Sequence, residues 1–214
     1  MLWIVKIKWD ETIMKFIVFE GIDGCGKTTL IPLMKEYLES HGKSVVVVND
    51  PSSTIPECVE IRKELLHGTK ERTPLEELEL YVKARKYLQD YICQCEDVDF
   101  VLCDRYLYST LAYQGAGNGT GMVEIIEAHI RHNIQLTPDH VVYLQIDYPT
   151  SVARRKAQPA DVIESRGEDY YKRVIGEFDF MANAYDHFRV IDARKPLHEV
   201  VEECKHFLST FLIR

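Results

Sequence analysis

The stretch KFIVFEGIDGCGKTTL, residues 15–30, decides the fold, because an apolar run leads into a glycine-rich loop and then a helical segment. Gly21, Gly26, Lys27 and Thr28 fill the pattern G-x-x-x-x-G-K-[ST]. Glycines let backbone N–H groups approach phosphates closely, and the positive end of the following helix points at them. Strand, loop and helix together predict a phosphate-binding loop, in which Lys27 reaches the β- and γ-phosphates and Thr28 binds Mg²⁺.

Short apolar runs alternate with helical segments along the rest of the chain. The runs rich in Val, Ile and Leu predict buried strands at residues 15–20, 44–50, 99–104, 140–147 and 188–192. Helices are predicted at residues 27–40, 56–67, 74–95, 121–135, 149–157, 168–187 and 196–212. This alternation predicts an α/β fold of the P-loop NTPase type, a doubly wound parallel five-stranded sheet flanked by helices.

Composition narrows the function classes. The chain has 214 residues, 46% of them apolar, and a net charge of -8. Such a charge repels polyanions, so nucleic acid is not expected as the main partner. No apolar run approaches the ~18 residues of a membrane helix, so we expect no membrane association. The six cysteines form no C-x-x-C pair, which favours reduced structural thiols in a cytoplasmic protein.

The first residues stand apart from this pattern. Residues 1–14, MLWIVKIKWDETIM, precede the predicted phosphate-binding strand, and residues 15–214 are interpreted as a single domain. One interpretation of the extension is an added edge strand, since LWIVKIKW partly alternates. The other, slightly favoured, is a segment outside the catalytic fold.

A second group of polar residues follows the third predicted strand. Asp104 and Arg105 come directly after an apolar run, where ligands of doubly wound sheets bind. A carboxylate there can organise Mg²⁺ and its waters, and a guanidinium can bridge two phosphate groups. The plainer alternative is that Asp104 caps the next helix and Arg105 lies on the surface. Because the chain has no N-K-x-D element, a small phosphotransferase is favoured over a GTPase.

Three blocks, FEGIDGCGKTTL, DRYLYSTLAYQG and PDHVVYLQIDYPTSVARRK, resemble thymidylate kinase, and the resemblance runs from residue 15 to the end. It implies a fold with a short lid, and an enzyme that phosphorylates dTMP with ATP and Mg²⁺. The implied ATP-binding residues are Gly21, Gly24, Cys25, Gly26, Lys27, Thr28 and Thr29. The implied substrate-binding residues are Asp23, Asp50, Tyr81, Arg85, Arg105, Ser109, Thr110, Tyr113 and Gln114. The implied metal ligands are Thr28 and, through water, Asp104.

The segment ELYVKARKY, residues 79–87, places an aromatic residue four positions before an arginine. This spacing puts Tyr81 and Arg85 on one face of a helix. The resemblance implies that Tyr81 stacks on thymine and that Arg85 meets its polar edge. Without the resemblance, a core tyrosine beside a solvated arginine would be preferred.

A basic segment after the fourth strand resembles the lid of nucleoside monophosphate kinases. Some thymidylate kinases carry an arginine inside the phosphate loop, but this chain has Gly24 there, so the lid is expected to supply the cations. Val162 occupies the place of a lid arginine, and Arg154, Arg155 or Arg166 is expected to replace it. The catalytic residues are predicted to be Lys27, Asp104, Arg105, Arg154 and Arg155.

The acceptor site also departs from the family. Asn49, before Asp50, stands where an arginine normally helps to hold the acceptor phosphate, and Arg62 is a candidate replacement. The expected activity is therefore a dTMP kinase. The alternatives are a broader deoxynucleoside monophosphate kinase, a deoxynucleoside kinase with Glu20 as base, and an ATP-binding regulatory module. The expected partners are small-molecule nucleotides and, by resemblance, a second copy in a homodimer.

Overall fold

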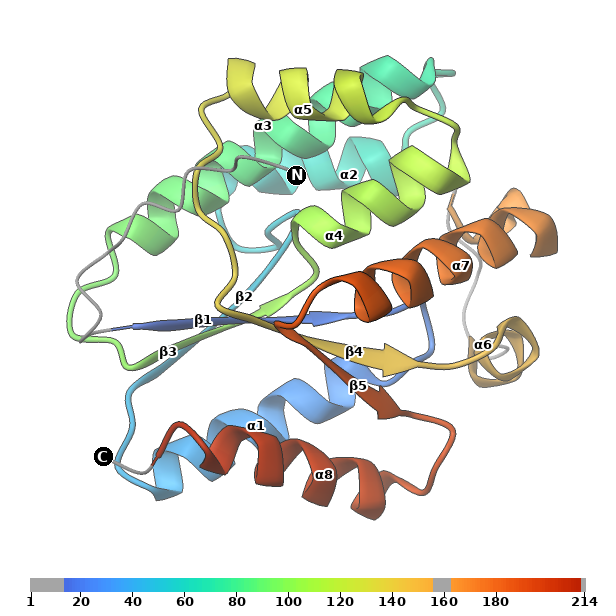
Figure 1. Ribbon diagram of the computed structural model, residues 1–214. Helices are drawn as coiled ribbons and strands as arrows, with labels where there is room; N and C mark the ends of the chain where they lie inside the picture. The colour runs from blue at the N-terminus through green and yellow to red at the C-terminus, as the bar shows by residue number, and fades with distance from the viewer. Residues whose placement is uncertain (1–13, 156–162, 213–214) are drawn as a thin grey trace.

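A computed structural model describes residues 14–155 and 163–212 of the chain. Its centre is a parallel sheet of five strands in the order β2-β3-β1-β4-β5 (Figure 1). This arrangement confirms the predicted fold class. The strands are β1 (Lys15–Glu20), β2 (Val45–Asn49), β3 (Phe100–Asp104), β4 (His140–Gln145) and β5 (Phe188–Asp192).

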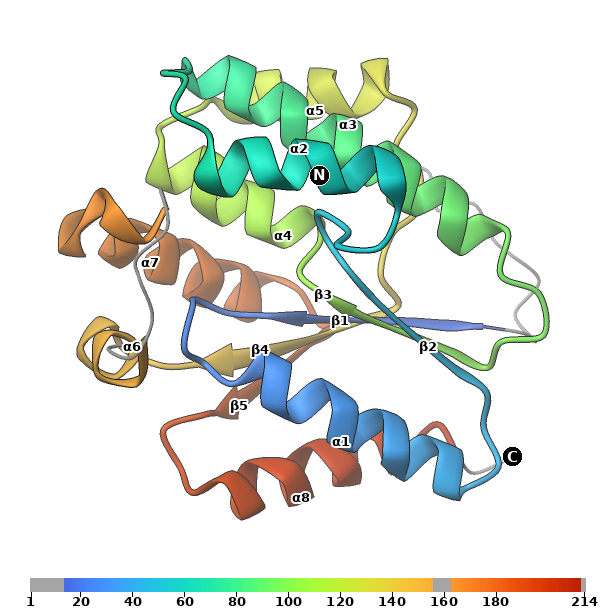
Figure 2. The same cartoon turned by 180° about the vertical axis from the view of Figure 1, so that it is seen from behind.

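Helices cover both faces of the sheet. Figures 1 and 2 show α1 and α8 together on one face, and α2, α3, α4, α5 and α7 on the other. The bounds on the two sides are α1 (Lys27–Ser40), α8 (Leu197–Ser209), α2 (Pro56–His67), α3 (Pro74–Cys93), α4 (Leu107–Thr110), α5 (Met122–Arg131) and α7 (Glu168–Ala184). A π-helix, η1 (Leu111–Gly117), continues α4; α6 (Tyr148–Arg155) follows β4, and η2 (Glu164–Arg166) precedes α7.

The central strands are buried because both faces are covered. Ile17, Val18, Phe19 and Val101 have no exposed surface. This full burial explains why the strands read as continuous apolar runs instead of alternating. Helix α3 begins at an N-terminal signal in the sequence: it starts with Pro74 after a capping box in which the side chains of Thr73 and Glu76 bond each other's backbone N–H.

The strand register brings the polar residues to one edge. Asp104 at the end of β3 lies beside Asn49 of β2 on one side and Phe19 of β1 on the other. Glu20, Asp50 and Arg105 therefore follow at the same carboxyl edge, where parallel sheets of this kind bind their ligands.

The sequence analysis placed no helix between the strand at residues 99–104 and the helix at residues 121–135. In the structure, α4 and η1 run from Leu107 to Gly117. Residues 1–13 and 156–162, which hold the N-terminal extension and part of the predicted lid, lie outside the described residues. Within the described ranges, no helix has the length and apolarity needed to cross a membrane.

Candidate active site

The loop after β1 has a backbone that only glycine adopts readily at three positions. Gly21, Gly24 and Gly26 have φ angles of 138°, 79° and 105°. A Cβ at Gly21 would lie 2.6 Å from the carbonyl oxygen of Leu144, so β4 also leaves no room for a side chain. The loop therefore keeps its backbone N–H groups available at the start of α1, as a phosphate-binding loop requires.

Lys27 and Asp104 face each other beneath this loop. Lys27 Nζ donates to the carbonyl oxygen of Gly21 at 3.0 Å, lies 3.4 Å from Cys25 Sγ and 4.0 Å from Asp104 Oδ1. Cys25 is buried within the loop. Asp104 does not cap α4, whose N-cap residue is Tyr106 and which has no side-chain cap. The buried Oδ1 of Asp104 accepts no hydrogen bond from the part of the chain that the structure describes.

These residues alone do not form a metal cage. Among residues 14–155 and 163–212, no group of three or more His, Cys, Asp and Glu side chains could hold a metal ion. Thr28 and Thr29 are exposed at the first turn of α1, open to a ligand seated in the loop. A cation at this place would take most of its ligands from a nucleotide and from water, as Mg²⁺ commonly does.

Asp23 collects three donors from distant parts of the chain. Arg105 Nη2 donates to Oδ1 at 2.6 Å, and the hydroxyls of Tyr113 and Tyr171 donate to Oδ2 at 3.3 and 3.1 Å. Burial alone would raise the pKa of Asp23, but the charges of Arg105 and Lys27 outweigh it and hold that pKa well below its usual range. Tyr171 in α7 was not predicted from the sequence.

Arg105 reaches this position because its backbone is left-handed, with φ of 68°. Its guanidinium donates to the Gly21 carbonyl oxygen at 2.8 Å and to Ser109 Oγ at 3.3 Å, and lies over the ring of Tyr113 at 5.0 Å. The side chain therefore links the phosphate loop to the helix that follows β3. A non-glycine residue in this conformation is uncommon, and such residues cluster at functional sites.

Glu20 has a structural role in the described site. Its carboxylate accepts the backbone N–H groups of Tyr106 and Ser109, both at 3.0 Å, and the hydroxyl of Ser109 at 2.6 Å. Burial raises the pKa of Glu20, although Arg105 opposes the shift. Glu20 thus fixes the start of the helix after β3 and does not point freely toward an acceptor hydroxyl.

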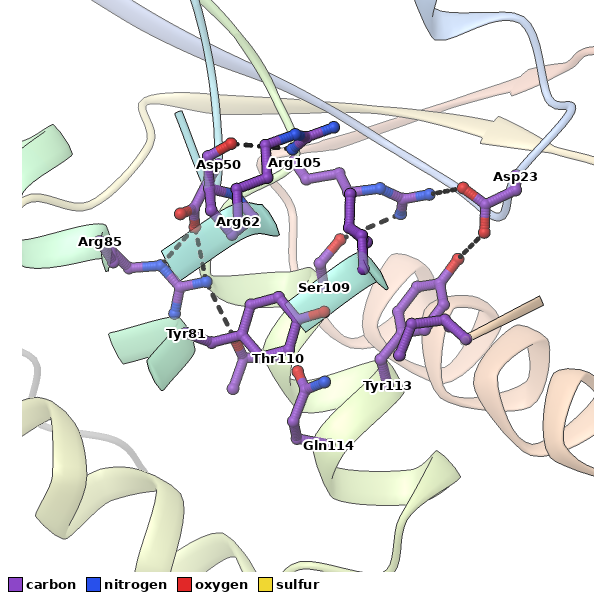
Figure 3. A pocket seen from close by; sticks show the side chains of 13 residues that line it. Asp23, Asp50, Arg62, Tyr81, Arg85, Arg105, Ser109, Thr110, Tyr113 and Gln114 are labelled. Atoms are coloured by element: carbon purple, nitrogen blue, oxygen red, sulfur yellow. Dashed lines mark hydrogen bonds and ion pairs between the residues drawn. The ribbon is translucent and has the colours of Figure 1, made fainter. Parts of the chain in front are cut away.

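A pocket opens between the Asp23–Arg105 pair and helices α2 and α3 (Figure 3). All nine residues predicted to bind substrate line it. The complete lining is Asp23, Asp50, Pro51, Arg62, Leu66, Tyr81, Arg85, Arg105, Ser109, Thr110, Tyr113, Gln114 and Ile163. The predicted pairing of Tyr81 with Arg85 on one helical face is present, with both side chains at the pocket wall.

Arg85 is almost completely buried, and most of its donors are taken by the protein. Nε donates to Asp50 Oδ2 at 2.7 Å, and Nη2 donates to Thr110 Oγ1 at 2.8 Å and to the Tyr106 carbonyl oxygen at 3.1 Å. Nη1 lies 2.8 Å from His129 Nε2. The guanidinium is therefore held rigidly, and among the described residues Nη1 has one partner, so its second hydrogen can serve a ligand.

His129 in α5 was not predicted either. Its Nδ1 lies 2.7 Å from the carbonyl oxygen of Ile125. A carbonyl only accepts, so Nδ1 carries the hydrogen and Nε2 accepts from Arg85. Burial, with the charge of Arg85, lowers the pKa of His129 to about 4. The imidazole is neutral near pH 7 and supports the buried arginine without competing with its charge.

Asn49 stands where the family has an arginine, and a different arginine, Arg62, lies close to it. Asn49 uses its amide within the turn, donating to the Pro51 carbonyl oxygen at 2.8 Å and accepting from Ser53. Arg62 in α2 donates to the same Pro51 oxygen at 2.8 Å and lines the pocket. Asn49 is therefore a turn residue, and Arg62 brings a positive charge to the pocket wall beside this turn.

The three predicted lid arginines lie at different places. Arg154 donates to the carbonyl oxygens of Gly24 at 3.4 Å and Ala193 at 2.9 Å, and Arg155 lies over the ring of Tyr171 at 5.0 Å. Arg166 instead forms an ion pair with Glu77 of α3. The two α6 arginines are thus near the phosphate loop, whereas Arg166 belongs to the far end of the pocket. Val162 lies outside the described residues.

Comparison with known proteins agrees with this geometry. A family model described as thymidylate kinase matches residues 19–204. The curated relatives include a thymidylate kinase of Thermosipho melanesiensis, 34% identical over 92% of this chain and 98% of its own length. Those of Pelotomaculum thermopropionicum and a Synechococcus species are 37% and 36% identical, each over 92% of this chain and 96% of their own length. This chain belongs to the thymidylate kinase family.

Proposed function

We propose that this protein transfers the γ-phosphoryl group of ATP to the 5′-phosphate of dTMP, giving dTDP and ADP. The observation that carries the proposal is the continuity of one polar site. The phosphate loop, Asp23 and Arg105 form one end, and the pocket with Tyr81 and Gln114 forms the other. A nucleoside monophosphate lying along it would place its phosphate toward the loop and its base between α3 and η1.

Positioning and charge neutralisation would supply most of the catalysis, because the acceptor phosphate is already an anion and needs no strong base. Lys27 is the cation for the donor phosphates. Arg105 lies where it would face donor and acceptor, and Arg62 supports the acceptor side in place of Asn49. Arg154 and Arg155 are the lid-side cations that lie near the phosphate loop.

Mg²⁺ is part of the same proposal. The chemistry of the residues fits it, since Asp104 offers a buried carboxylate oxygen without a hydrogen-bond partner in the described chain, and Thr28 offers an exposed hydroxyl. When bound with ATP, Mg²⁺ neutralises charge on the phosphates. We expect chelation with EDTA to abolish turnover and added MgCl₂ to restore it.

The base would be held at the other end of the pocket. Tyr81 supplies an aromatic face for stacking, and the remaining Nη1 hydrogen of Arg85 suits a carbonyl oxygen such as thymine O4. Gln114 is placed to face the neighbouring ring nitrogen. Asp23 is the candidate partner for the sugar 3′-hydroxyl, as the family resemblance implies.

The test is ADP formation from ATP and Mg²⁺ with dTMP, dUMP, dCMP, AMP and thymidine side by side. Preferred turnover of dTMP is the expected result. Turnover of several deoxynucleoside monophosphates would replace the proposal with a broader specificity. Turnover of thymidine alone would favour a deoxynucleoside kinase, although Glu20 is committed to backbone hydrogen bonds. No turnover with any acceptor would favour an ATP-binding regulatory module.

Three further expectations belong to this proposal. The enzyme is expected to be cytoplasmic, to act as a homodimer and to have no nucleic-acid partner. The family resemblance supports the dimer, and the net charge of -8 supports the absence of nucleic-acid binding. Size-exclusion chromatography with light scattering would measure the oligomeric state directly.

A further inference from the structure

A buried carboxylate lies behind the base end of the pocket without lining it. Glu77 in α3 is only 8% exposed and is absent from the pocket wall. Its Oε1 accepts from Gln114 Nε2 at 3.0 Å and from Asn118 Nδ2 at 3.1 Å. Its Oε2 accepts from Arg166 Nη2, which balances its charge. This cluster belongs neither to the phosphate loop nor to the group of donors around Asp23.

The cluster determines which end of the Gln114 amide faces Glu77. An ionised carboxylate only accepts hydrogen bonds, so the amide must turn its NH₂ group toward it. The oxygen of Gln114 is then left on the opposite side. Figure 3 shows this oxygen turned toward the side of the pocket where Tyr81 lies, with the nitrogen directed away. Gln114 therefore offers the pocket a hydrogen-bond acceptor.

Arg166 makes the arrangement rigid. It also donates to Asn118 Oδ1 and to the hydroxyl of Tyr170 at 3.1 Å, and its guanidinium lies 5.1 Å from that ring centroid. Arg166 thereby fixes the position of the Glu77 carboxylate, whose other oxygen accepts from the Gln114 amide.

We propose that Glu77, paired with Arg166, is a positioning residue that makes the pocket select a pyrimidine carrying an N3–H group. This inference rests on the proposed function. Thymine and uracil carry a hydrogen on N3 that can donate to Gln114 Oε1, whereas cytosine N3 carries a lone pair. With cytosine, Gln114 Oε1 and the N3 lone pair are two acceptors facing each other, so the Gln114 oxygen stays unpaired. This corresponds to roughly a 5- to 150-fold loss of affinity for the cytosine nucleotide.

The variant Glu77→Gln tests the proposal with almost no change of shape. Its side-chain oxygen can still accept from Arg166, while its NH₂ group donates to Gln114 Oε1. The Gln114 amide then turns its own NH₂ group toward the base. We expect the KM and the Kd for dTMP to rise about tenfold or more, kcat to change little, and the ratio of the dCMP Kd to the dTMP Kd to fall about tenfold.

Glu79→Gln is the matched control. It removes a carboxylate from the same helix, but Glu79 pairs with Arg131 and His132 on the α5 side and does not line the pocket. We expect it to leave the ratio of the two dissociation constants unchanged.

The exchange variant Glu77→Gln with Gln114→Glu supplies a rescue. Gln at position 77 donates to the new carboxylate, whose other oxygen faces N3–H, so an acceptor returns to the pocket. If Glu77→Gln acts through the orientation of the Gln114 amide, the exchange variant should recover most of the dTMP affinity. If it acts through a loss of packing, the affinity should not recover. The exchange variant also keeps the test decisive if Glu77→Gln alone fails to fold.

Calorimetric binding of dTMP and dCMP to the full chain, together with turnover, separates the two proposals. A wild-type protein that does not phosphorylate dTMP refutes the proposed function, and the ratio of dissociation constants still tests the inference. If Glu77→Gln weakens dTMP and dCMP equally, or no more than Glu79→Gln does, the inference is wrong even when wild type is an active dTMP kinase.

Discussion

Breaking the buried ion pair of Arg85 and Asp50 should destabilise the fold by several kcal/mol. Both side chains are 1% exposed, and their charged atoms are 2.7 Å apart. Asp50→Asn keeps an oxygen that can accept from Arg85 Nε but removes the negative charge. Breaking a buried pair costs about 3–5 kcal/mol, because the remaining charge lies unbalanced in a medium of low polarity.

The expected loss is at the lower end of that range. Arg85 keeps its bonds to the Tyr106 carbonyl oxygen and to Thr110, and its guanidinium lies 5.1 Å from the Tyr106 ring centroid. We therefore expect Asp50→Asn to lower the free energy of unfolding by about 3 kcal/mol. For a chain of this size that corresponds to a fall in Tm of about 6–12 °C.

Urea unfolding of wild type, Asp50→Asn and Asp90→Asn measures the effect. Asp90→Asn is the control, because it makes the same substitution in an exposed ion pair. Asp90 pairs with Lys86 on α3, and its side chain is 48% exposed. Exposed pairs of this spacing contribute about 0.3–0.5 kcal/mol. If the two variants lose stability within about 1 kcal/mol of each other, the buried charge pair does not have the importance assigned to it.

Three other predictions concern single residues. Lys27→Ala should abolish ADP formation and leave the far-ultraviolet circular dichroism unchanged; near-normal turnover would contradict its assignment. Tyr171→Phe removes one of the three donors to Asp23 and should lower kcat/KM for dTMP about tenfold, as measured by initial rates; an unchanged value would make that bond dispensable. Burial and the charge of Arg85 lower the pKa of His129 to about 4 in the folded protein. As the pH falls from about 6.5 to 4, this imidazole is therefore protonated in the unfolded chain but stays neutral in the folded protein. Wild type should therefore lose roughly 3 kcal/mol over that interval, and His129→Gln should show less acid destabilisation in urea titrations at pH 7 and pH 5; equal pH dependence in both proteins would exclude this role.

The parts of the site that the sequence predicted are those encoded locally. The phosphate loop follows a buried strand and precedes a helix, so its composition and its context agree. Asp104 and Arg105 follow a buried strand, and parallel strands end at one edge. Tyr81 and Arg85 are four residues apart, which is enough to place them on one face of a helix.

The parts that could not be predicted depend on packing between distant elements. Tyr171 lies 148 residues from Asp23, and His129 lies 44 residues from Arg85. Glu77 belongs to a charged helical segment, PLEELELYVKARK, and in such a segment the sequence pattern predicts that an acidic side chain is exposed to solvent. The helix at residues 107–117 was missed because its glycines resemble a turn, although the packing of η1 against α7 retains them in a helix.

Gly24 connects the chemistry of the loop to the arginines of α6. A Cβ at this position would lie 3.0 Å from the Ser151 carbonyl oxygen and 3.4 Å from the Arg155 side chain, on a backbone with φ of 79°. An arginine at position 24 would therefore adopt a strained backbone and require α6 to shift by a few tenths of an ångström. The same close packing brings Arg154 to the loop, where it donates to the Gly24 carbonyl oxygen at 3.4 Å. The absence of an arginine at position 24 and the approach of the α6 arginines to the loop thus both involve the close packing of Gly24 against α6.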